Sequence, residues 1–501
     1  MIKCASLRQY HAVSLNWVLA ALIGWVSIDN ALLFAFLGKN YWAACAASLA
    51  ATVAITYLVA RMPSNVLRAE ISIKTLLFCV FAALFLLILG GEGRFLYANP
   101  DWQIRDTLLR DMGNNSWPFF YNINGNTEIL RAPIGMYLKP AIIGGSSQVK
   151  RDLAILFCNT LILGGLFAAG SVLFQNTKMR IIAFLVFVFF SGLDVIGFGI
   201  LHHMGSLLAF DHLEPWLPSS QYSSHITQLF WVPQHAFAGW FCALLFLLWE
   251  RRYIRFSLFF AAIPLLAIWS PLAIMGAVPF AIYVGIVILW RRDILSSDIM
   301  ICLLSLALSI SALLYLRSGF SDVKSTIETL PILNFMLLLL VEIIPFAIFL
   351  VVKPSEYGFG ITIAAANITI ICLLIMPHYR IGVSNDFQMR ASIMPLAILG
   401  ITMAGVITDV GSRSSRLILS ILLLIGSVTG LMEIKRSFMY RPSPPSQCSM
   451  IQAWYQQTGL IADTSTYFAP RTSLPPILQP SFIKPAYASG AKQCWSREWA
   501  S

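Results

Sequence analysis

Charged residues are scarce in this 501-residue chain, at 11%, whereas soluble globular proteins carry about 25%. Hydrophobic residues make up 58% of it, and its mean hydropathy is +0.75. This balance excludes an ordinary soluble domain and predicts an all-α, polytopic membrane protein. Because many apolar stretches approach 20 residues, we expect helices to span the membrane, since the strands of a β-barrel would give shorter, alternating segments.

Several functional signals are also missing. The nine cysteines include no CxxC pair and no metal-ligand spacing, so the sequence supports no cofactor, and a divalent metal is an open but unsupported alternative. No nucleotide-binding motif, cleavable signal peptide or strong internal repeat is visible. The net charge of +11 does not indicate nucleic acid, because much of it lies in short loops where the positive-inside rule explains it.

The apolar segments predict about thirteen transmembrane helices. Lys and Arg gather in alternate short loops, which places the N-terminus in the cytoplasm. The run 255–290 has two interpretations, because Trp269-Ser-Pro271 divides it into two helices or into a kinked helix and a re-entrant piece. The segments are 15–37, 41–60, 75–90, 152–173, 179–200, 233–250, 255–271, 272–290, 299–317, 332–352, 360–376, 391–409 and 415–433.

We divide the chain into a transmembrane domain, 1–433, and a tail, 434–501. This topology places the large acidic loop 91–150 and the tail on the outer face. The tail is rich in Pro and Ser and predicts an extended or weakly ordered segment. Cys448 and Cys494 would both face an oxidising compartment there, so a disulfide between them is an open alternative to two free thiols.

The outer loop gathers charge directly after an apolar segment. Asn99-Pro-Asp101 favours a helix start, with Asn99 as the cap, and we expect the helix to end near Met112. Its apolar residues would allow it to lie flat on the membrane surface. In that case its charges could simply face water. A following aromatic stretch, Trp117 to Tyr121, and Tyr137 instead favour a surface that accepts carbohydrate.

Two carboxylates of this helix are the candidate catalytic groups. Asp101 is four residues before Arg105, and Asp106 four before Arg110, so each pair can form along the helix. Asp101 and Asp106 are about 140° apart around an α-helix and do not share a face. If the loop is catalytic, we therefore expect one carboxylate to be the base and the other to be structural or to contact substrate.

Further polar groups are expected on the same face. Five of the seven histidines lie within 202–235, and we favour hydrogen-bonding roles for them over a metal site. The planar guanidinium groups of Arg380 and Arg390 match the oxygens of a phosphate. Ion pairing with Asp386 explains the presence of these arginines equally well. Asp29 and Asp194 lie inside apolar segments, which indicates either function or helix packing.

Two stretches resemble the GT-C superfamily of integral-membrane glycosyltransferases. Asn99-Pro-Asp101-Trp-Gln-Ile-Arg-Asp106, followed by Trp117-Pro, resembles the acidic loop of several bacterial GT-C-like proteins, and Asn385-Asp-Phe-Gln-Met-Arg390-Ala-Ser resembles a later segment of them. The architectural likeness covers roughly 75–410. In many members the loop follows the first helix, and here it follows the third. The resemblance implies a GT-C-like fold in the bacterial cytoplasmic (inner) membrane, with Asp101 or Asp106 as the base and outer arginines as carrier-phosphate contacts.

Three functions remain in competition. The first is transfer of a sugar from a polyprenyl-phosphate donor to a glycan, lipid or protein acceptor of the envelope. The second is a transporter or flippase for a polysaccharide or lipid-linked intermediate, which predicts ionisable residues at mid-membrane depth. The third is a non-catalytic assembly factor. The candidate residues are Asp101 and Asp106 for catalysis, and Glu92, Arg94, Arg105, Trp117, His203, His235, Arg380, Asp386 and Arg390 for substrate binding.

Overall fold

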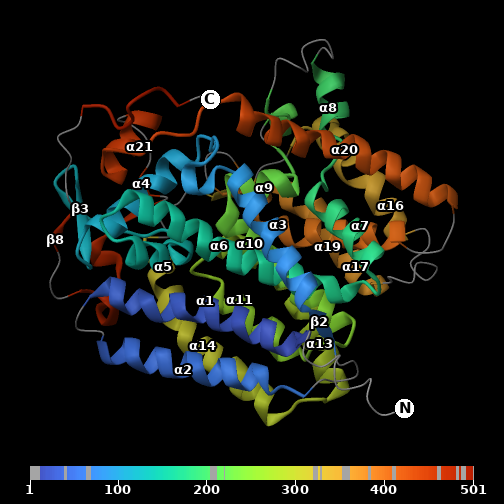
Figure 1. The fold of residues 1–501 in the computed structure, drawn as a ribbon, viewed down its shortest axis with the longest axis horizontal. Coiled ribbons are helices and arrows are strands. Elements are labelled where there is room, and N and C mark those ends of the chain that lie inside the picture. The colour runs from blue at the N-terminus through green and yellow to red at the C-terminus, as the bar shows by residue number, and fades with distance from the viewer. Residues whose placement is uncertain are drawn as a thin grey trace.

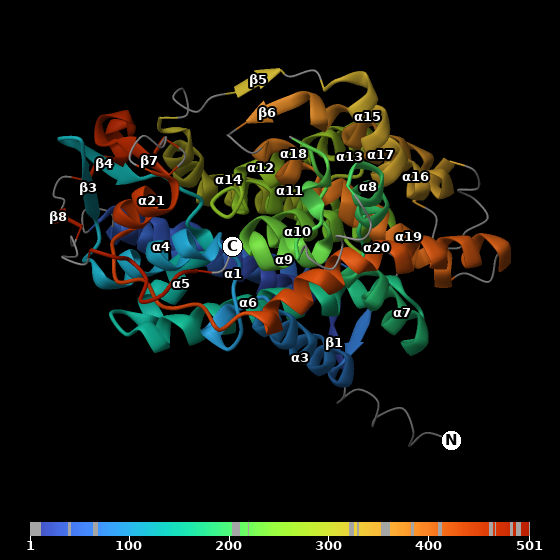
Figure 2. The ribbon, with the colours of Figure 1, turned by 90° about the horizontal axis from the view of Figure 1, so that it is seen from above.

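The structure is a computed structural model of the 501-residue chain, and helices fill most of it (Figures 1 and 2). The residues that it describes are 12–38, 42–63, 69–202, 211–218, 220–319, 325–327, 330–351, 361–381, 385–408, 413–459, 464–465, 467–480, 484–486 and 492–499. His203 lies outside these ranges, and so does the role expected for it.

Six helical stretches are long and apolar enough to cross a membrane, and five shorter apolar ones accompany them among the described residues. The long ones are α1 (Leu15–Leu37), α2 (Trp42–Ala60), α6 (Gln148–Gly170) with η4 (Ser171–Leu173), α14 (Ser296–Arg317), α15 (Ile332–Leu338) through η8 (Leu339–Ile343) to α16 (Ile344–Val351), and α20 (Arg413–Met439). The shorter ones are α3 (Ile73–Leu89), α11 (Phe256–Leu265), α13 (Val278–Arg291), α17 (Ile363–Ile375) with η9 (Met376–His378), and α19 (Ile393–Thr408). The expected helical membrane architecture is present, and the count of thirteen spans stays a prediction.

Two expected segments are broken. The run 179–200 forms α7 (Thr177–Val188) and α8 (Asp194–Leu201), with an irregular turn between them. The run 255–290 forms α11, a short α12 (Pro271–Met275) and α13, so neither of its two interpretations describes it fully. Ser270 caps α12, and Pro271 stands at its first position, where a missing N–H costs nothing.

The centre of the bundle is α10 (Pro233–Glu250). Every residue from Pro233 to Trp249 is buried, as expected of a helix that is apolar on all sides and enclosed by others. It packs against α6, α11 and α19, and both views show it inside the bundle (Figures 1 and 2). The described residues outside the tail also form η3 (Glu92–Arg94), α4 (Trp102–Asn114), α5 (Gly135–Gly144), η6 (Glu214–Trp216), α9 (His225–Trp231) and α18 (Asp386–Ala391).

Short strands form three small sheets among the described residues. β1 (Ala12–Ser14) pairs with β2 (Glu70–Ser72), and β5 (Ser325–Ile327) with β6 (Tyr379–Ile381). The third sheet has the order β7-β4-β3-β8. Its inner strands are β3 (Phe119–Ile123) and β4 (Asn126–Leu130), and its outer strands β7 (Phe468–Pro470) and β8 (Lys484–Pro485) come from the tail.

The tail is thus folded onto the 91–150 loop. Besides β7 and β8, it contains α21 (Met450–Thr458), η10 (Arg471–Ser473) and η11 (Pro476–Leu478), where the composition suggested an extended or weakly ordered segment. A disulfide joins Cys448 to Cys494, which selects one of the two alternatives left open by the sequence. α21, α4 and β3 lie together at the left end of both views (Figures 1 and 2).

Candidate functional site

The helix α4 carries the candidate carboxylates, and its start is fixed by side-chain contacts. The helix begins at Trp102 and ends at Asn114, each two residues later than expected. Asn99 Oδ1 accepts from the Asp101 amide at 3.1 Å, while Asn99 Nδ2 and Trp102 Nε1 both donate to the carbonyl of Phe230, at 2.7 and 2.9 Å. These contacts attach the 91–150 loop to α9, which belongs to the 202–235 stretch that the sequence places on the same face.

The apolar face of α4 points into the protein. Trp102, Leu108 and Met112 are each 3% exposed or less, and α4 packs against α5 and α21. The expectation that this face lies on the membrane surface is therefore wrong. The physical reason is that the folded tail offers α4 a protein partner, which the Pro-rich composition of the tail did not indicate.

Asp101 and Arg105 form the expected pair along α4. Arg105 Nη2 lies 3.3 Å from Asp101 Oδ2, and the Asp101 side chain is 40% exposed. Arg105 itself is buried. Its Nη1 donates to Tyr137 Oη at 3.3 Å and to the side-chain oxygen of Gln234, whereas its Nε has no hydrogen-bond partner among the described residues. A buried guanidinium thus faces one partly exposed carboxylate, an arrangement that favours a further anion.

Charges from distant segments lie within electrostatic reach of the phenol of Tyr467. Burial raises the pKa of Tyr467, the charges of Arg105 and Arg390 oppose this rise, and those of Asp101 and Asp386 add to it. All four charges therefore lie within electrostatic reach of one tail residue. The predicted meeting of Asp101 and Arg390 on one face of the molecule agrees with this geometry.

Arg390 and His235 complete this group. Arg390 pairs with Asp386 one turn earlier in α18, which is one of the two interpretations that the sequence left open. The buried His235 contacts Ser270 Oγ through Nδ1 at 2.7 Å and lies within electrostatic reach of both Arg390 and Arg105. The group made by Asp101, Arg105, His235, Arg390 and Tyr467 is called the outer charge cluster below, after the face on which the sequence predicts it.

Asp106 belongs to a second, more buried group. Arg94 lies 2.7 Å from Asp106 and 2.9 Å from Asp152, and the Asp106 side chain is 11% exposed. Burial raises the pKa of Asp106 to about 6; Arg94 opposes the rise and Asp152 adds to it. The tight turn before α4, with φ of 89° at Gly91 and 77° at Gly93, brings Arg94 to this position.

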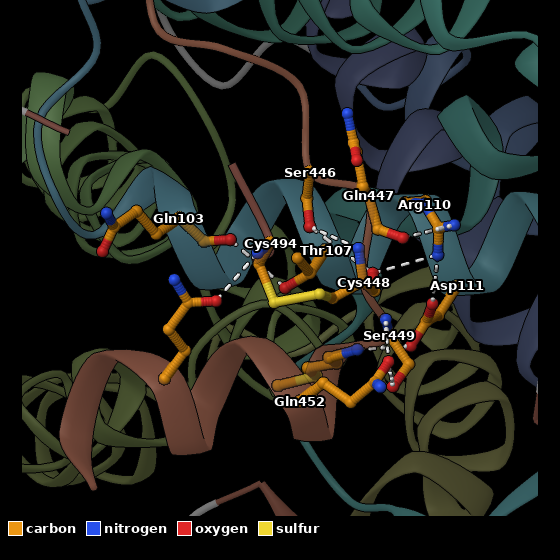
Figure 3. The surroundings of a disulfide bond; sticks show 12 residues. Gln103, Thr107, Arg110, Asp111, Ser446, Gln447, Cys448, Ser449, Gln452 and Cys494 are labelled. Atoms are coloured by element: carbon orange, nitrogen blue, oxygen red, sulfur yellow. Dashed lines mark hydrogen bonds and ion pairs between the residues drawn. A yellow bond between two sulfur atoms is a disulfide. The ribbon is translucent and has the colours of Figure 1, made fainter. Parts of the chain in front are cut away.

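The predicted pairing of Asp106 with Arg110 is therefore wrong. Arg110 lies 3.4 Å from Asp111 and donates to the carbonyls of Cys448 and Gln447, at 3.0 and 3.2 Å (Figure 3). Asp111 in turn accepts from the amide of Met450 at 2.7 Å. The last turns of α4 thus bind the tail through Arg110 and Asp111. Asp106 pairs instead with Arg94, which lies in the turn before α4.

The remaining candidates occupy structural positions. Glu92 is buried and accepts from Asn159 Nδ2 at 2.9 and 3.0 Å, and burial raises its pKa to about 8. Trp117 donates to the carbonyl of Met112 at 2.8 Å and packs edge-on against Phe36. Arg380 lies in β6, opposite Thr326 of β5. Among the described residues, no group of three or more His, Cys, Asp or Glu could hold a metal ion.

The two acids expected inside apolar segments differ. Asp29 pairs with Lys139 at 2.6 Å and accepts from Trp269 Nε1 at 3.0 Å, which agrees with a packing role. Asp194 accepts from Ser191 and Thr429, both at 2.7 Å. Two further acids that sequence reasoning did not single out for burial, Glu214 and Glu342, lie within electrostatic reach of Asp194. The second of these is in the π-helical turn η8, a local distortion that a hydropathy pattern does not reveal.

Tyr137 was expected on a surface that accepts carbohydrate, whereas the contacts of Arg105 with Tyr137 and Gln234 were not expected. Tyr137 and Gln234 contact this guanidinium, and Tyr467 lies within electrostatic reach of it. The position of Gln234 directly before His235 was a usable signal, whereas Tyr467 could be placed only by knowing that the tail folds back. Comparison with protein-family models, curated proteins and solved structures finds no match to this chain.

Proposed function

We propose that this protein is a membrane glycosyltransferase, which moves a sugar from a polyprenyl-phosphate donor to a glycan, lipid or protein acceptor. The observation that carries the proposal is the outer charge cluster: a 40% exposed carboxylate, Asp101, beside the buried cation Arg105, with Arg390 nearby. A transfer of this kind needs a base for the acceptor and a fixed cation for the leaving phosphate. Both kinds of group lie in this cluster.

The roles follow from the charges. Asp101 takes the proton of the acceptor hydroxyl while the acceptor oxygen forms a bond to the anomeric carbon. The bond between that carbon and the phosphate oxygen breaks, and its electron pair leaves with the phosphate. Arg390 stabilises the charge that develops there, because its fork matches phosphate oxygens, while Arg105 holds the carboxylate of Asp101 in place. Attack opposite to the leaving group inverts the configuration of the sugar.

Asp101 is a better candidate for the base than Asp106. Its side chain is 40% exposed, against 11% for Asp106. Asp106 already contacts Arg94 at 2.7 Å, in a group that also contains Asp152. A carboxylate committed to a buried ion pair is poorly placed to exchange protons with an acceptor, and its removal leaves its partner unpaired. We therefore assign the chemical role to Asp101 and a positioning role to Asp106.

The test compares Asp101→Asn and Asp106→Asn in purified protein with a polyprenyl-phosphate sugar donor and radiolabelled sugar. Asn keeps the size of Asp but cannot act as the base. We expect Asp101→Asn to lower kcat roughly 10²- to 10⁴-fold with little change in donor binding, and Asp106→Asn to lower Tm more than Asp101→Asn does. Full transfer by the Asp101→Asn variant would exclude Asp101 as the base.

A transporter or flippase is the second candidate function. It is favoured by the acids Asp194, Glu214 and Glu342, which are each 2% exposed or less. Glu214 and Glu342 form no ion pair with a described residue. Ionisable groups inside a membrane bundle often serve proton or substrate paths. Glu342→Gln in proteoliposomes would abolish movement of a labelled lipid-linked sugar if this function holds, and would leave sugar transfer unchanged if the first one does.

A further inference from the structure

A cavity of 390 Å³ lies at the other end of α3 from the outer charge cluster. This volume is within the range of ligand pockets, roughly 300–1,000 Å³. Its walls come from α3, α6, η4, α7, α10 and α19, and they are lined mostly by apolar side chains such as Phe78, Phe167, Phe184, Trp240 and Leu244. Phe78 is 49% exposed, so the cavity opens sideways on the apolar surface of the bundle.

The end of the cavity nearest β2 and the start of α7 is called its mouth below, and it is polar and basic. Lys74, in the first turn of α3, and Arg180, in the first turn of α7, both line it, and no acidic residue of the described ranges does. Neither cation makes an ion pair with a residue that the structure describes. The hydroxyls of Ser72, Thr75 and Thr177 stand beside them. The cavity thus combines a cationic, hydrogen-bonding rim with an apolar interior.

The helix ends strengthen this pattern. Ser72 caps α3 by accepting from the Thr75 amide, and Asn176 caps α7 by accepting from the Met179 amide. Two helix N-termini, with their partial positive charge, therefore lie near the mouth together with Lys74 and Arg180. α3 has 17 residues and is about 25 Å long, so the mouth and Glu92 are separated by most of a bilayer thickness. Figure 1 shows α3 running from β2 toward α9 and α4.

We propose that this cavity binds one anionic glycerophospholipid, with an acyl chain among the aromatic side chains and its headgroup phosphate between Lys74 and Arg180. The charge at the mouth selects an anionic headgroup, and the lateral opening admits a chain directly from the bilayer. By the predicted topology the mouth faces the cytoplasmic leaflet, where basic residues meet anionic lipid. The proposal does not depend on the proposed transferase activity, whose groups lie at the other end of α3.

The experiment is native mass spectrometry of delipidated protein titrated with phosphatidylglycerol or with phosphatidylcholine of the same acyl chains. We expect phosphatidylglycerol to bind more tightly. The double variant Lys74→Gln/Arg180→Gln should lose roughly tenfold or more of that affinity, and its weaker binding of phosphatidylcholine should not change. Lys178→Gln is the matched control, because Lys178 is exposed on α7 and does not line the cavity; it should bind like the wild type.

A second variant tests the acyl-chain site without removing charge. A Cβ at Gly170 would meet one side-chain atom of Leu244, at 3.7 Å, so Gly170→Leu extends into the cavity with little strain. It should weaken the binding of both phospholipids while Tm is kept. Equal binding of the two phospholipids by the wild type, or wild-type binding by Gly170→Leu, would overturn the proposal. So would tighter binding of polyprenyl phosphate, which would assign the cavity to a different lipid.

Discussion

Arg94 lies 2.7 Å from Asp106 and joins the turn before α4 to the helix itself. The same guanidinium lies 2.9 Å from Asp152 at the start of α6. One cation therefore serves two carboxylates that are largely shielded from water. This contact makes Asp106 part of the frame that holds α4 in place, while Asp101 remains the more open carboxylate of that helix.

Replacing Arg94 should destabilise the protein more than replacing a surface arginine. Arg94→Gln leaves Asp106 and Asp152 mostly buried without their cation, a loss that typically costs ~3–5 kcal/mol. We expect a clear fall in Tm, measured by thermal unfolding in detergent. Arg292→Gln is a suitable control because Arg292 is exposed at the end of α13. A variant that unfolds at the wild-type temperature would show that the three groups are not coupled.

Glu92 should make stability depend on pH. Burial raises its pKa from 4.5 to about 8 in the folded protein, so the folded state holds this proton more tightly than the unfolded state does. Its contribution is therefore complete below pH 4.5 and is lost as the pH rises toward 8. We expect Glu92→Gln to flatten the fall in Tm between pH 6 and pH 8.5. An unchanged slope in this variant would assign the pH dependence to other groups.

Arg105→Lys should weaken function without unfolding the protein. Lysine keeps the charge but cannot reach Asp101, Tyr137 and Gln234 at once, because it lacks the planar fork. We expect a loss of roughly 10- to 100-fold in transfer, as for one hydrogen bond to a charged group. Arg110→Lys is the control on the same helix, since Arg110 contacts the tail. Equal losses in both variants would indicate a general effect on α4.

The disulfide between Cys448 and Cys494 should stabilise the tail. It closes a loop with a sequence separation of 46, for which a contribution of ~2–4 kcal/mol is typical. We expect Cys448→Ser/Cys494→Ser to lower Tm, and a reducing agent to lower Tm of the wild type alone. Six other cysteines of the described residues are free, and they are buried or half-buried. If the reductant also destabilises the double variant, it acts elsewhere than on this bond.

Reporter fusions can test the topology. Fusions after Arg61, Asn126, Arg251 and Gln456 should report cytoplasm, outside, cytoplasm and outside. The structure adds a constraint, because β4, which contains Asn126, pairs with β7 of the tail and α4 packs against α21, which contains Gln456. The second and fourth fusions must therefore report the same side. Opposite readings would contradict both the topology and the sheet.

Local patterns explain what the sequence could predict. The helix 102–114 and the pair of Asp101 with Arg105 depend on neighbours within one or two turns, and both were expected nearly as they are. The same rule failed for Asp106 and Arg110, because Arg94 reaches Asp106 from outside the helix. A competing partner from another segment cannot be read from the spacing along one helix.

Long-range pairing explains which features the sequence could not predict. Pro and Ser in 434–501 are typical of weak order, yet β7 and β8 need only two or three residues each to extend a sheet begun by β3 and β4. Likewise, the hydropathy of 179–200 predicts one apolar helix, although the chain turns between α7 and α8. Composition averages over such short features, and so Tyr467 was not expected within electrostatic reach of Arg105.

The pairing of β4 with β7 also has a consequence for the chain during its synthesis. Leu130 pairs with Phe468, 338 residues later in the chain (468 − 130). At a synthesis rate of about 5–20 residues per second, roughly 20 to 70 s separate the two strands at the ribosome. During that interval β4 has an unpaired edge, and the side of α4 that packs against α21 is uncovered. A nascent chain of this protein should therefore need a partner that shields this loop until the tail arrives.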